Sequence, residues 1–518
     1  MTSAPAGPPY RLGIDIGGTF TDLVLLREGA LPVVAKVLST PHSFARGVLD
    51  GVRALLHRAG VAPSEVADLV HGTTVATNAL LQRRGARTGL LTTAGFRDLL
   101  EIRRLRFPRL YDLAWEKPAP LVERALRLEV DERLDHTGAL VRPLDEAGAR
   151  EAIARLRREG VQAVAVCLLH AYADGAHEAR LGALLHEALP GAYVALSHQV
   201  LPQIQEYERL STTVVDAYVG PVVARYLEEM EGGLAGLGLS APLRVMQSNG
   251  GSMSAGVARR RPARLIESGP AAGAVAVAAL ARGAAGESSR LAGRGWDGGG
   301  AVAQRGGQRA GRGALLALDM GGTTAKAALI LDGALPLAAE AEIGAGVTAT
   351  TRLNRGGGYA HSLPAVDLVE VGAGGGSLLW LDDGGALQVG PQSAGAAPGP
   401  VCYGRGGTAP TLTDANVVLG YLNPLALAGG TVPLDAGAAR RAVEALGAGQ
   451  GMATEEAALG AYQVAVASMV RAVRAVSAER GHDPAGMTLV AFGGNGPLHG
   501  VAVAAALGIP RVLVPPAP

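Results

Sequence analysis

The stretch Leu12-Gly-Ile-Asp-Ile-Gly-Gly-Thr-Phe-Thr-Asp22 decides the fold of this chain. In it, an apolar strand runs directly into a carboxylate, Asp15, and then into a glycine turn with two threonines. The same order returns far downstream in Leu316-Ala-Leu-Asp-Met-Gly-Gly-Thr-Thr-Ala-Lys326, where Asp319 takes the place of Asp15. A single turn of this kind is as typical of an ordinary hairpin as of a binding loop. Its repetition in one chain favours two loops that face each other.

The residue types of both turns are those that bind phosphate and magnesium. Paired glycines reach backbone angles closed to other residues and let main-chain N–H groups approach an anion. A carboxylate repels phosphate, but it can hold Mg²⁺ through water, because that ion dehydrates reluctantly. We therefore predict a metal site at Asp15 and Asp319. The predicted phosphate site consists of Gly17, Gly18, Thr19, Thr21, Gly321, Gly322, Thr323 and Thr324.

The two common phosphate-binding motifs do not account for these turns. The chain has no G-x-x-x-x-G-K-[ST] loop, and the first turn lacks the G-x-G-x-x-G spacing and the helix that should follow it. Instead, residues 21–26 continue as a second strand. The pattern therefore indicates a nucleotide-binding fold in which the phosphate turn opens a β-hairpin.

Composition narrows the class of protein. A chain of 518 residues is too long for one hydrophobic core and predicts two or three domains. The net charge of +1 gives no support for binding to nucleic acid or to an anionic membrane. Two cysteines, Cys167 and Cys402, cannot build a disulfide framework. With no apolar leader and no apolar run of membrane length, we expect a cytoplasmic protein.

The alternation of strand and helix patterns predicts an α/β protein with mixed sheets flanked by helices. We place a domain boundary near residue 200, which gives units of residues 10–200 and 201–518. In the second unit, Pro221 lacks an N–H group and is expected to kink or restart the helix that begins at residue 206. Segment 283–313 is rich in Gly, Arg and Ser, and we predict that it is a disordered insertion.

Several other residues are candidates with two interpretations each. The turn Gly493-Gly494-Asn495 follows a strand and either lies under an adenine or ribose or merely connects the strand to a helix. His71 either faces a ligand cleft or anchors its turn by hydrogen bonds. Glu267 is either a buried carboxylate or a helix cap.

A basic cluster is formed by Arg103, Arg104, Arg106 and Arg109. It belongs either to a solvent-exposed loop region or to a lid or a partner-binding surface.

The chain resembles the hydantoinase A/5-oxoprolinase family over nearly all of residues 10–518. The stretches that carry this resemblance are Gly13-Ile-Asp-Ile-Gly-Gly-Thr-Phe-Thr-Asp22, His71-Gly-Thr-Thr74, Ser248-Asn-Gly-Gly251, Glu267-Ser-Gly-Pro-Ala-Ala-Gly273, Asp319-Met-Gly-Gly-Thr323, Gly372-Ala-Gly-Gly-Gly-Ser377, Pro398-Gly-Pro-Val-Cys-Tyr-Gly404, Thr413-Asp-Ala-Asn416 and Phe492-Gly-Gly-Asn-Gly-Pro497. Members of that family usually continue past the strand that ends near Val514, so the chain resembles a C-terminally shortened copy.

The resemblance implies the actin-like ATPase fold, with duplicated ribonuclease H-like domains. It also implies ATP-dependent ring opening of a cyclic amide, such as a hydantoin or 5-oxoproline, through phosphorylation of the carbonyl oxygen. ATP and Mg²⁺ are the implied cofactors, and a B-type hydantoinase subunit is the implied partner. On this basis Gly493, Gly494 and Asn495 serve the nucleoside. Candidates for the substrate side are Glu370, the loop 372–377, Asp414 and His71.

Two other functions remain open at this point. The ATP-using subunit of an acetone- or acetophenone-type carboxylase shares the same loops. An inactive nucleotide-binding scaffold subunit would also keep them. ATP turnover with lactams would indicate the amide hydrolase, and ATP turnover with a ketone and bicarbonate would indicate the carboxylase. ATP binding without turnover would indicate the scaffold subunit.

Overall fold

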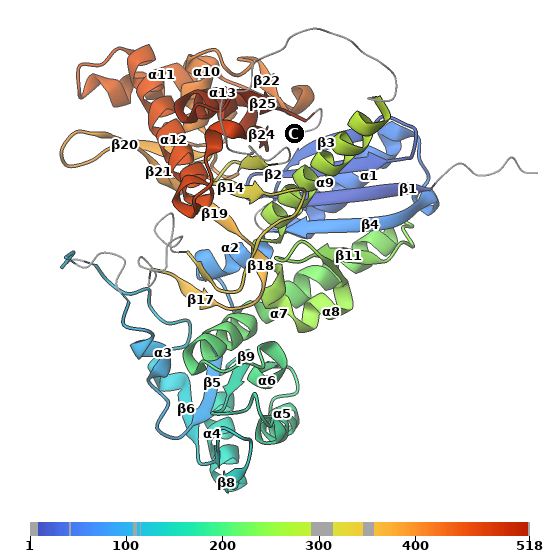
Figure 1. The fold of residues 1–518 in the computed structure, drawn as a ribbon, viewed down its shortest axis with the longest axis vertical. Coiled ribbons are helices and arrows are strands. Elements are labelled where there is room, and N and C mark those ends of the chain that lie inside the picture. Colours follow the sequence, from blue (N-terminus) through green and yellow to red (C-terminus); the bar gives the residue numbers. More distant parts are fainter. Residues whose placement is uncertain are drawn as a thin grey trace, which may run out of the picture.

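Three β-sheets of four to six strands, flanked by helices, build the described part of the fold (Figure 1). The computed structural model describes residues 9–40, 43–106, 111–113, 115–291, 314–344 and 357–515. The predicted α/β class with mixed sheets is confirmed, since two of the sheets contain both parallel and antiparallel neighbours.

The first sheet is built on the hairpin that the opening stretch predicts. Its order is β12-β11-β4-β1-β2-β3, with β1 antiparallel to β2 and parallel to β4. Alternation along β1 buries Leu12, Ile14 and Ile16 on the core face and turns Asp15 to the other face. The strands are β1 (Tyr10–Ile16), β2 (Phe20–Leu26), β3 (Val33–Leu38), β4 (Val66–Thr73), β11 (Leu243–Met246) and β12 (Ser252–Ser254).

The C-terminal sheet repeats this arrangement around the second glycine turn. Its order is β19-β14-β13-β24-β25, which matches β3-β2-β1-β4-β11 in both order and strand direction. Asp319 on β13 therefore occupies the place that Asp15 has on β1. The strands are β13 (Leu315–Met320), β14 (Ala325–Ile330), β19 (Leu368–Val371), β24 (Thr488–Phe492) and β25 (Arg511–Leu513).

A third, all-parallel sheet forms the lower part of the molecule in Figure 1. Its order is β10-β9-β5-β6, and the central strand β9 is fully buried, as expected for a parallel sheet with covered faces. The strands are β5 (Thr88–Thr93), β6 (Arg127–Val130), β9 (Ala163–Cys167) and β10 (Tyr193–Leu196).

Helix α7 (Glu206–Gly236) connects the first and third sheets and runs through Pro221 without interruption. The predicted restart of the helix at Pro221 is therefore wrong, while a kink there stays a prediction. Val219 and Val223 on either side are at most 1% exposed, so packing of both flanking turns outweighs the hydrogen bond that proline cannot donate.

Helix α9 (Ser268–Leu291) leads from the first sheet to the C-terminal sheet. Its buried small residues Ala271, Ala274 and Ala278 pack against Ala317 and Ala328 of the C-terminal sheet. The helix also enters the segment predicted as a disordered insertion. Residues 283–291 are helical instead, as the last turns of α9, while residues 292–313 lie outside the described part of the chain.

The sheet pairing does not follow the domain boundary predicted at residue 200. Strand β11 pairs with β4 through Leu243 and Leu69, so the first sheet takes strands from both sides of that boundary. Pairings between distant segments are invisible to a boundary drawn from local composition.

Shorter elements complete the described structure. The other helices are α1 (Phe44–Ala59), α2 (Val75–Leu81), α3 (Leu99–Ile102), α4 (Glu146–Arg158), α5 (Ala176–Ala188), α6 (Ser197–Val200), α8 (Ala255–Arg260), α10 (Leu412–Val418), α11 (Ala436–Ala448), α12 (Thr454–Val476) and α13 (Gly496–Leu507). Two-stranded pairs are β7 (Arg133–Leu134) with β8 (Leu140–Arg142), β15 (Leu337–Ala338) with β18 (Ala365–Val366), β16 (Ala341–Ile343) with β17 (Tyr359–His361), β20 (Ser377–Leu381) with β21 (Leu387–Ser393), and β22 (Ala426–Leu427) with β23 (Val432–Pro433). Within the described ranges, none of the helices has the length and apolar character needed to cross a bilayer.

Candidate nucleotide and metal site

The two glycine turns have the same backbone geometry. In the first, Gly17 N–H donates to the carbonyl of Phe20 at 2.9 Å; in the second, Gly321 N–H donates to Thr324 at 3.1 Å. Each turn therefore closes a hairpin immediately after the strand that carries Asp15 or Asp319. The repeated sequence corresponds to a repeated local structure.

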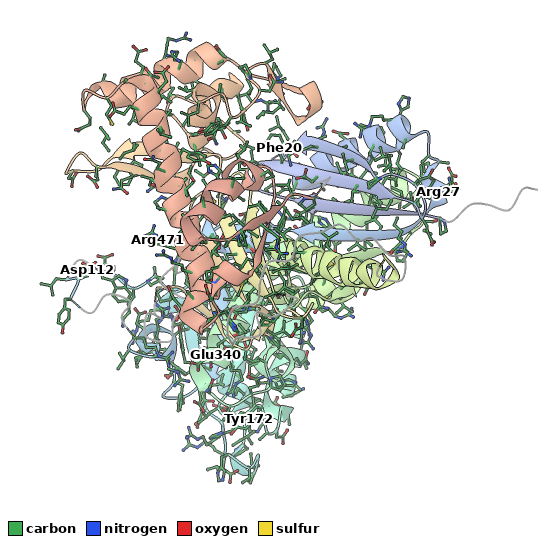
Figure 2. All side chains as sticks on the ribbon, turned by 45° about the horizontal axis from the view of Figure 1, so that its top comes forward. Phe20, Arg27, Asp112, Tyr172, Glu340 and Arg471 are labelled. Atoms are coloured by element: carbon green, nitrogen blue, oxygen red, sulfur yellow. The ribbon has the colours of Figure 1, made fainter. Side chains whose placement is uncertain are left out.

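The two turns meet face to face. A Cβ atom added to Gly18 would lie 3.1 Å from Thr323 Oγ1, and one added to Gly322 would overlap the Thr19 side chain. Thr19 Oγ1 is buried and has no hydrogen-bond partner. The side chain of Phe20, labelled in Figure 2, meets the Tyr403 ring edge-on at 6.5 Å. The hairpin of the first sheet therefore contacts the C-terminal part of the molecule directly.

The backbone at Gly72 and Gly269 lies close to the carboxylate of Asp15. Cβ atoms on Gly72 or Gly269 would come within 2.7 Å and 3.2 Å of Asp15 Oδ1. The surrounding protein removes water and raises the pKa of Asp15 to about 7, and Asp22 and Asp319 add to the rise. Asp15 is nevertheless exposed to solvent, which moderates the rise.

Asp319 has similar surroundings on the C-terminal sheet. A Cβ on Gly493, whose φ is +78°, would overlap its carboxylate, so this position requires glycine. The pKa of Asp319 is raised to about 6, chiefly by burial and also by Asp22, whereas Lys326 opposes the rise. Asp319 thus raises the pKa of Asp15, and Asp22 of the first hairpin raises the pKa of Asp319, so charges on each hairpin act on the carboxylate of the other.

Charged side chains extend this environment along both sheets. Lys36 binds Asp22 at 2.6 Å on the first sheet. On the C-terminal sheet, Lys326 Nζ lies 2.9 Å from Glu267 and 3.5 Å from Glu370. Burial alone would lower the pKa of Lys326, but the two glutamates outweigh it and raise this pKa above its ordinary value.

Negative charge exceeds positive charge in this cluster. It contains five carboxylates, those of Asp15, Asp22, Asp319, Glu267 and Glu370, and the ammonium groups of Lys36 and Lys326. A divalent cation would offset the excess. In the described ranges no three or more metal-ligating side chains converge, so such a cation would take most of its ligands from water or phosphate oxygens, as Mg²⁺ prefers.

The turn at residues 493–495 is tied to the second glycine turn. Asn495 donates from its backbone to Met320 at 2.8 Å and from its side chain to Gly321 at 3.1 Å. Asn495 also precedes α13 as its N-terminal cap residue. The structure therefore brings this predicted nucleoside turn beside the predicted phosphate turn.

The loop of residues 372–377 supports the second glycine turn from behind. Gly375 N–H donates to Gly321 at 3.0 Å and Gly376 N–H to Gly322 at 2.6 Å. Gly374 lies so close to Thr323 that a Cβ there would reach its backbone at 2.5 Å. Since residues 373–377 are buried, their contacts fix the turn in place.

Three predicted site residues have their polar groups engaged in the protein. His71 is fully buried, with its ring nitrogens 3.3 Å from the Ile14 carbonyl and 2.7 Å from the Tyr226 hydroxyl; burial lowers its pKa to about 4. Asp414 is also fully buried and accepts hydrogen bonds from Thr411 and the backbone of residues 401–402. The Thr21 hydroxyl pairs with Ser39 at 3.1 Å. These contacts describe anchoring groups, and direct roles for the three stay predictions.

Sequence reasoning missed Lys326, Asp22 and Lys36. The signal was present in the two quoted stretches, because a hairpin places Asp22 opposite Asp15 and Lys326 opposite Asp319. Lys36 lies opposite Asp22, and Glu370 lies opposite Lys326, each on the next strand of its sheet. To predict these two neighbours, one must know which strand pairs next.

Comparison with known proteins assigns the family. The profile of the hydantoinase/oxoprolinase N-terminal region matches residues 11–189, and the hydantoinase/oxoprolinase profile matches residues 209–293 and 284–518. The chain belongs to the hydantoinase/oxoprolinase family. The resemblance drawn from the sequence motifs is thereby confirmed.

Relatives of this hydantoinase/oxoprolinase chain are longer than the chain itself. The caprolactamase subunit alpha of Pseudomonas jessenii is 38% identical over 98% of the chain and 68% of its own length. 5-Oxoprolinase 1 of Arabidopsis thaliana is 33% identical over 97% of the chain, which spans 40% of that relative.

Two solved structures of longer chains share its fold. Nucleotide-free acetone carboxylase superposes with a TM-score of 0.82 at 28% identity, covering 98% of this chain and 68% of the other. ATP-dependent caprolactamase superposes with a TM-score of 0.73 at 37% identity, covering 98% and 69%.

Proposed function

We propose that this chain uses ATP and Mg²⁺ to activate the carbonyl oxygen of a cyclic amide, so that water opens the ring. One observation carries the proposal: two matching glycine turns hold Asp15 and Asp319 in one carboxylate-rich environment. Relatives named as an ATP-dependent caprolactamase and a 5-oxoprolinase support the class of substrate.

The residues of the site fit a metal–nucleotide complex. The excess of carboxylates suits Mg²⁺, and the unpartnered Thr19 hydroxyl offers a hydrogen bond to a phosphate oxygen. Bound Mg·ATP would supply a phosphoryl group that converts the amide oxygen into a leaving group, because a planar amide resists attack by water.

The chain's own groups would hold and orient the reactants. Asp15 and Asp319 would bind water of the metal shell, and the N–H groups of the two glycine turns would donate to phosphate oxygens. Gly493, Gly494 and Asn495 would lie against the nucleoside. On the substrate side, Glu370 is the predicted residue that also belongs to the charged cluster.

We also propose that the two mixed sheets are the duplicated halves of an actin-like ATPase. Their shared strand order and direction supports this, as does the equivalent placement of Asp15 and Asp319. In such an arrangement a nucleotide would bind between the halves.

A partner subunit belongs to the same proposal. The caprolactamase relative is named as an alpha subunit. By analogy, we propose that a B-type hydantoinase subunit completes the hydrolysis and that the complex works in the cytoplasm.

A ketone carboxylase subunit is the second candidate. The superposition on acetone carboxylase, with a TM-score of 0.82, favours it specifically. The same phosphate turns would then serve phosphoryl transfer to a ketone enolate or to bicarbonate.

The deciding experiment measures phosphate release from ATP by the purified chain, with and without the B-type subunit. We expect release with lactams or hydantoins. Release that requires a ketone and bicarbonate would instead establish the carboxylase. Tight ATP binding without turnover under every condition would make the chain a nucleotide-binding scaffold.

A further inference from the structure

A pocket outside the two glycine turns collects most of the basic cluster noticed in the sequence. The space between its lining residues, part of which is open to solvent, is about 500 Å³. Arg103, Arg104, Arg106 and Lys117, which come from the region following α3, line it. Helix α7 and strands β16 and β17 form its other walls. Glu340, one of the lining residues, is labelled in Figure 2.

Arg103 is held in place but has an unused donor. Its Nε donates to the Tyr207 hydroxyl at 3.0 Å, and Nη2 donates to the carbonyl of Gly358. Nη1 is buried and has no hydrogen-bond partner. A buried charged donor without a hydrogen-bond partner destabilises the folded protein, so a ligand that accepts a hydrogen bond from Nη1 would bind favourably.

Ser362 supplies a second, independent donor to the same pocket. Its side chain is 5% exposed, and its hydroxyl has no hydrogen-bond partner. The Ser362 backbone is fixed, because its N–H donates to Thr212 at 3.1 Å. A guanidinium held by two hydrogen bonds and a buried hydroxyl on an anchored backbone therefore line one pocket, each with an unsatisfied donor.

The charge of the lining favours a singly charged ligand. Arg104 is already paired with Glu208. The remaining cations Arg103, Arg106 and Lys117 share the lining with Glu340 and Glu342. The four cationic and three acidic side chains of the lining give it a net charge of +1, which one carboxylate balances. A carboxylate can also accept both from a guanidinium and from a hydroxyl.

We propose that this pocket binds a small molecule through a single carboxylate group, with Arg103 and Ser362 as direct donors and Arg106 as a supporting charge. The carboxylate comes either from the substrate of the chain or from a separate ligand. The assignment stands on the pocket alone and does not depend on the proposed ATP chemistry.

The test is calorimetric titration of the full chain without ATP, using 5-oxoproline, propionate, propionamide and inorganic phosphate. We expect both carboxylates to bind and the neutral amide to fail. Ser362→Ala and Arg106→Gln should each weaken carboxylate binding about tenfold, the equivalent of one charge-assisted hydrogen bond. Stronger binding of 5-oxoproline than of propionate would identify the substrate as the source, and equal binding a separate ligand.

Arg124→Gln is the matched control, because Arg124 is exposed and pairs with Asp98 at a distance of 2.8 Å. It should bind the carboxylates as the unchanged chain does. Neither pocket variant should unfold the protein, since Arg106 is exposed and the Ser362 hydroxyl has no partner to lose. Absence of carboxylate binding, binding of phosphate alone, or binding unchanged in both pocket variants would overturn the proposal.

Discussion

Asp15 and Asp319 occupy equivalent positions in two hairpins, yet their cross-strand neighbours have opposite charges. Asp22 lies opposite Asp15, and Lys326 lies opposite Asp319. Burial raises the pKa of both carboxylates; Asp22 adds to the rise at Asp15, whereas Lys326 opposes the rise at Asp319. The two aspartates are equivalent in geometry and unequal in electrostatics.

Removal of either carboxylate tests the metal assignment. Asp15→Asn and Asp319→Asn keep the shape of the side chain but remove a charge that would hold the metal shell. We expect each to reduce Mg-dependent ATP hydrolysis by at least about a hundredfold, since such electrostatic groups typically contribute that much. Phosphate release and circular dichroism check activity and fold. Asp50→Asn, at an exposed position of α1, should change neither; undiminished turnover in both site variants would remove the assignment.

The same carboxylates predict how stability depends on pH. Their pKa values rise from 3.8 to about 7 for Asp15 and about 6 for Asp319 on folding, so the folded state binds more protons between about pH 4 and pH 7. Their contribution to the free energy of unfolding therefore falls as pH rises through this window. Melting temperatures of the unchanged chain and of the Asp15→Asn/Asp319→Asn variant, measured from pH 5 to pH 8, should diverge, with the variant gaining relative stability. Parallel curves would contradict the shifts.

Lys326 balances two glutamates at a nearly buried position. Lys326→Met would leave Glu267 and Glu370 without this partner, and we expect a loss of about 3–5 kcal/mol in the free energy of unfolding. Denaturant titration measures it. Adding Glu267→Gln should recover part of the loss. Lys36→Met removes a lysine from the more exposed pair with Asp22 and should cost less than about 1 kcal/mol.

At the scale of elements, local sequence patterns predicted correctly those features that lie within a single hairpin. The glycine turns follow from a spacing of a few residues, and the structure has both. The uninterrupted helix at Pro221 did not follow, because tertiary packing rather than local propensity keeps it. The pairing of Lys326 with Glu267 was out of reach as well, since it joins a strand to the residue that precedes a distant helix.

The buried loop behind the second turn gives an element-scale prediction. In Gly374→Ala, the added Cβ would collide with the Thr323 backbone and displace the phosphate turn. We expect weaker ATP binding, by about tenfold or more, with a modest loss of stability. Calorimetric titration with a non-hydrolysable ATP analogue measures it. Gly232→Ala, at an uncrowded site in α7, should leave binding unchanged and stabilise the helix by roughly 0.5–1 kcal/mol; equal affinity in both variants would contradict the supporting role of the loop.

At the scale of the whole molecule, the first sheet takes strands from both sides of the boundary predicted near residue 200, while the two family profiles, which end at residue 189 and begin at residue 209, meet close to that boundary. The chain leaves the first sheet after β4, builds the third sheet and α7, and then returns to add β11. Only the long-range pairing of Leu69 with Leu243 reveals this return. The C-terminal sheet was easier to predict, because the glycine turn between β13 and β14 repeats the sequence of the turn between β1 and β2.

The contact between the two turns implies a motion of the whole molecule. Gly18 approaches Thr323, and Gly322 approaches Thr19, too closely to leave room for a phosphate between them. If the proposed nucleotide binds between the turns, we therefore expect the two sheets to separate when it enters. Spin labels on Arg53→Cys in α1 and Arg441→Cys in α11 report this separation from exposed positions, while the native cysteines are buried. Pulsed dipolar spectroscopy should give a longer mean distance when a non-hydrolysable ATP analogue and Mg²⁺ are added. The Asp15→Asn/Asp319→Asn background should suppress the change, because it weakens the metal shell. An unchanged distance in a sample shown by calorimetry to be saturated with the analogue would mean that the nucleotide binds elsewhere than between the turns.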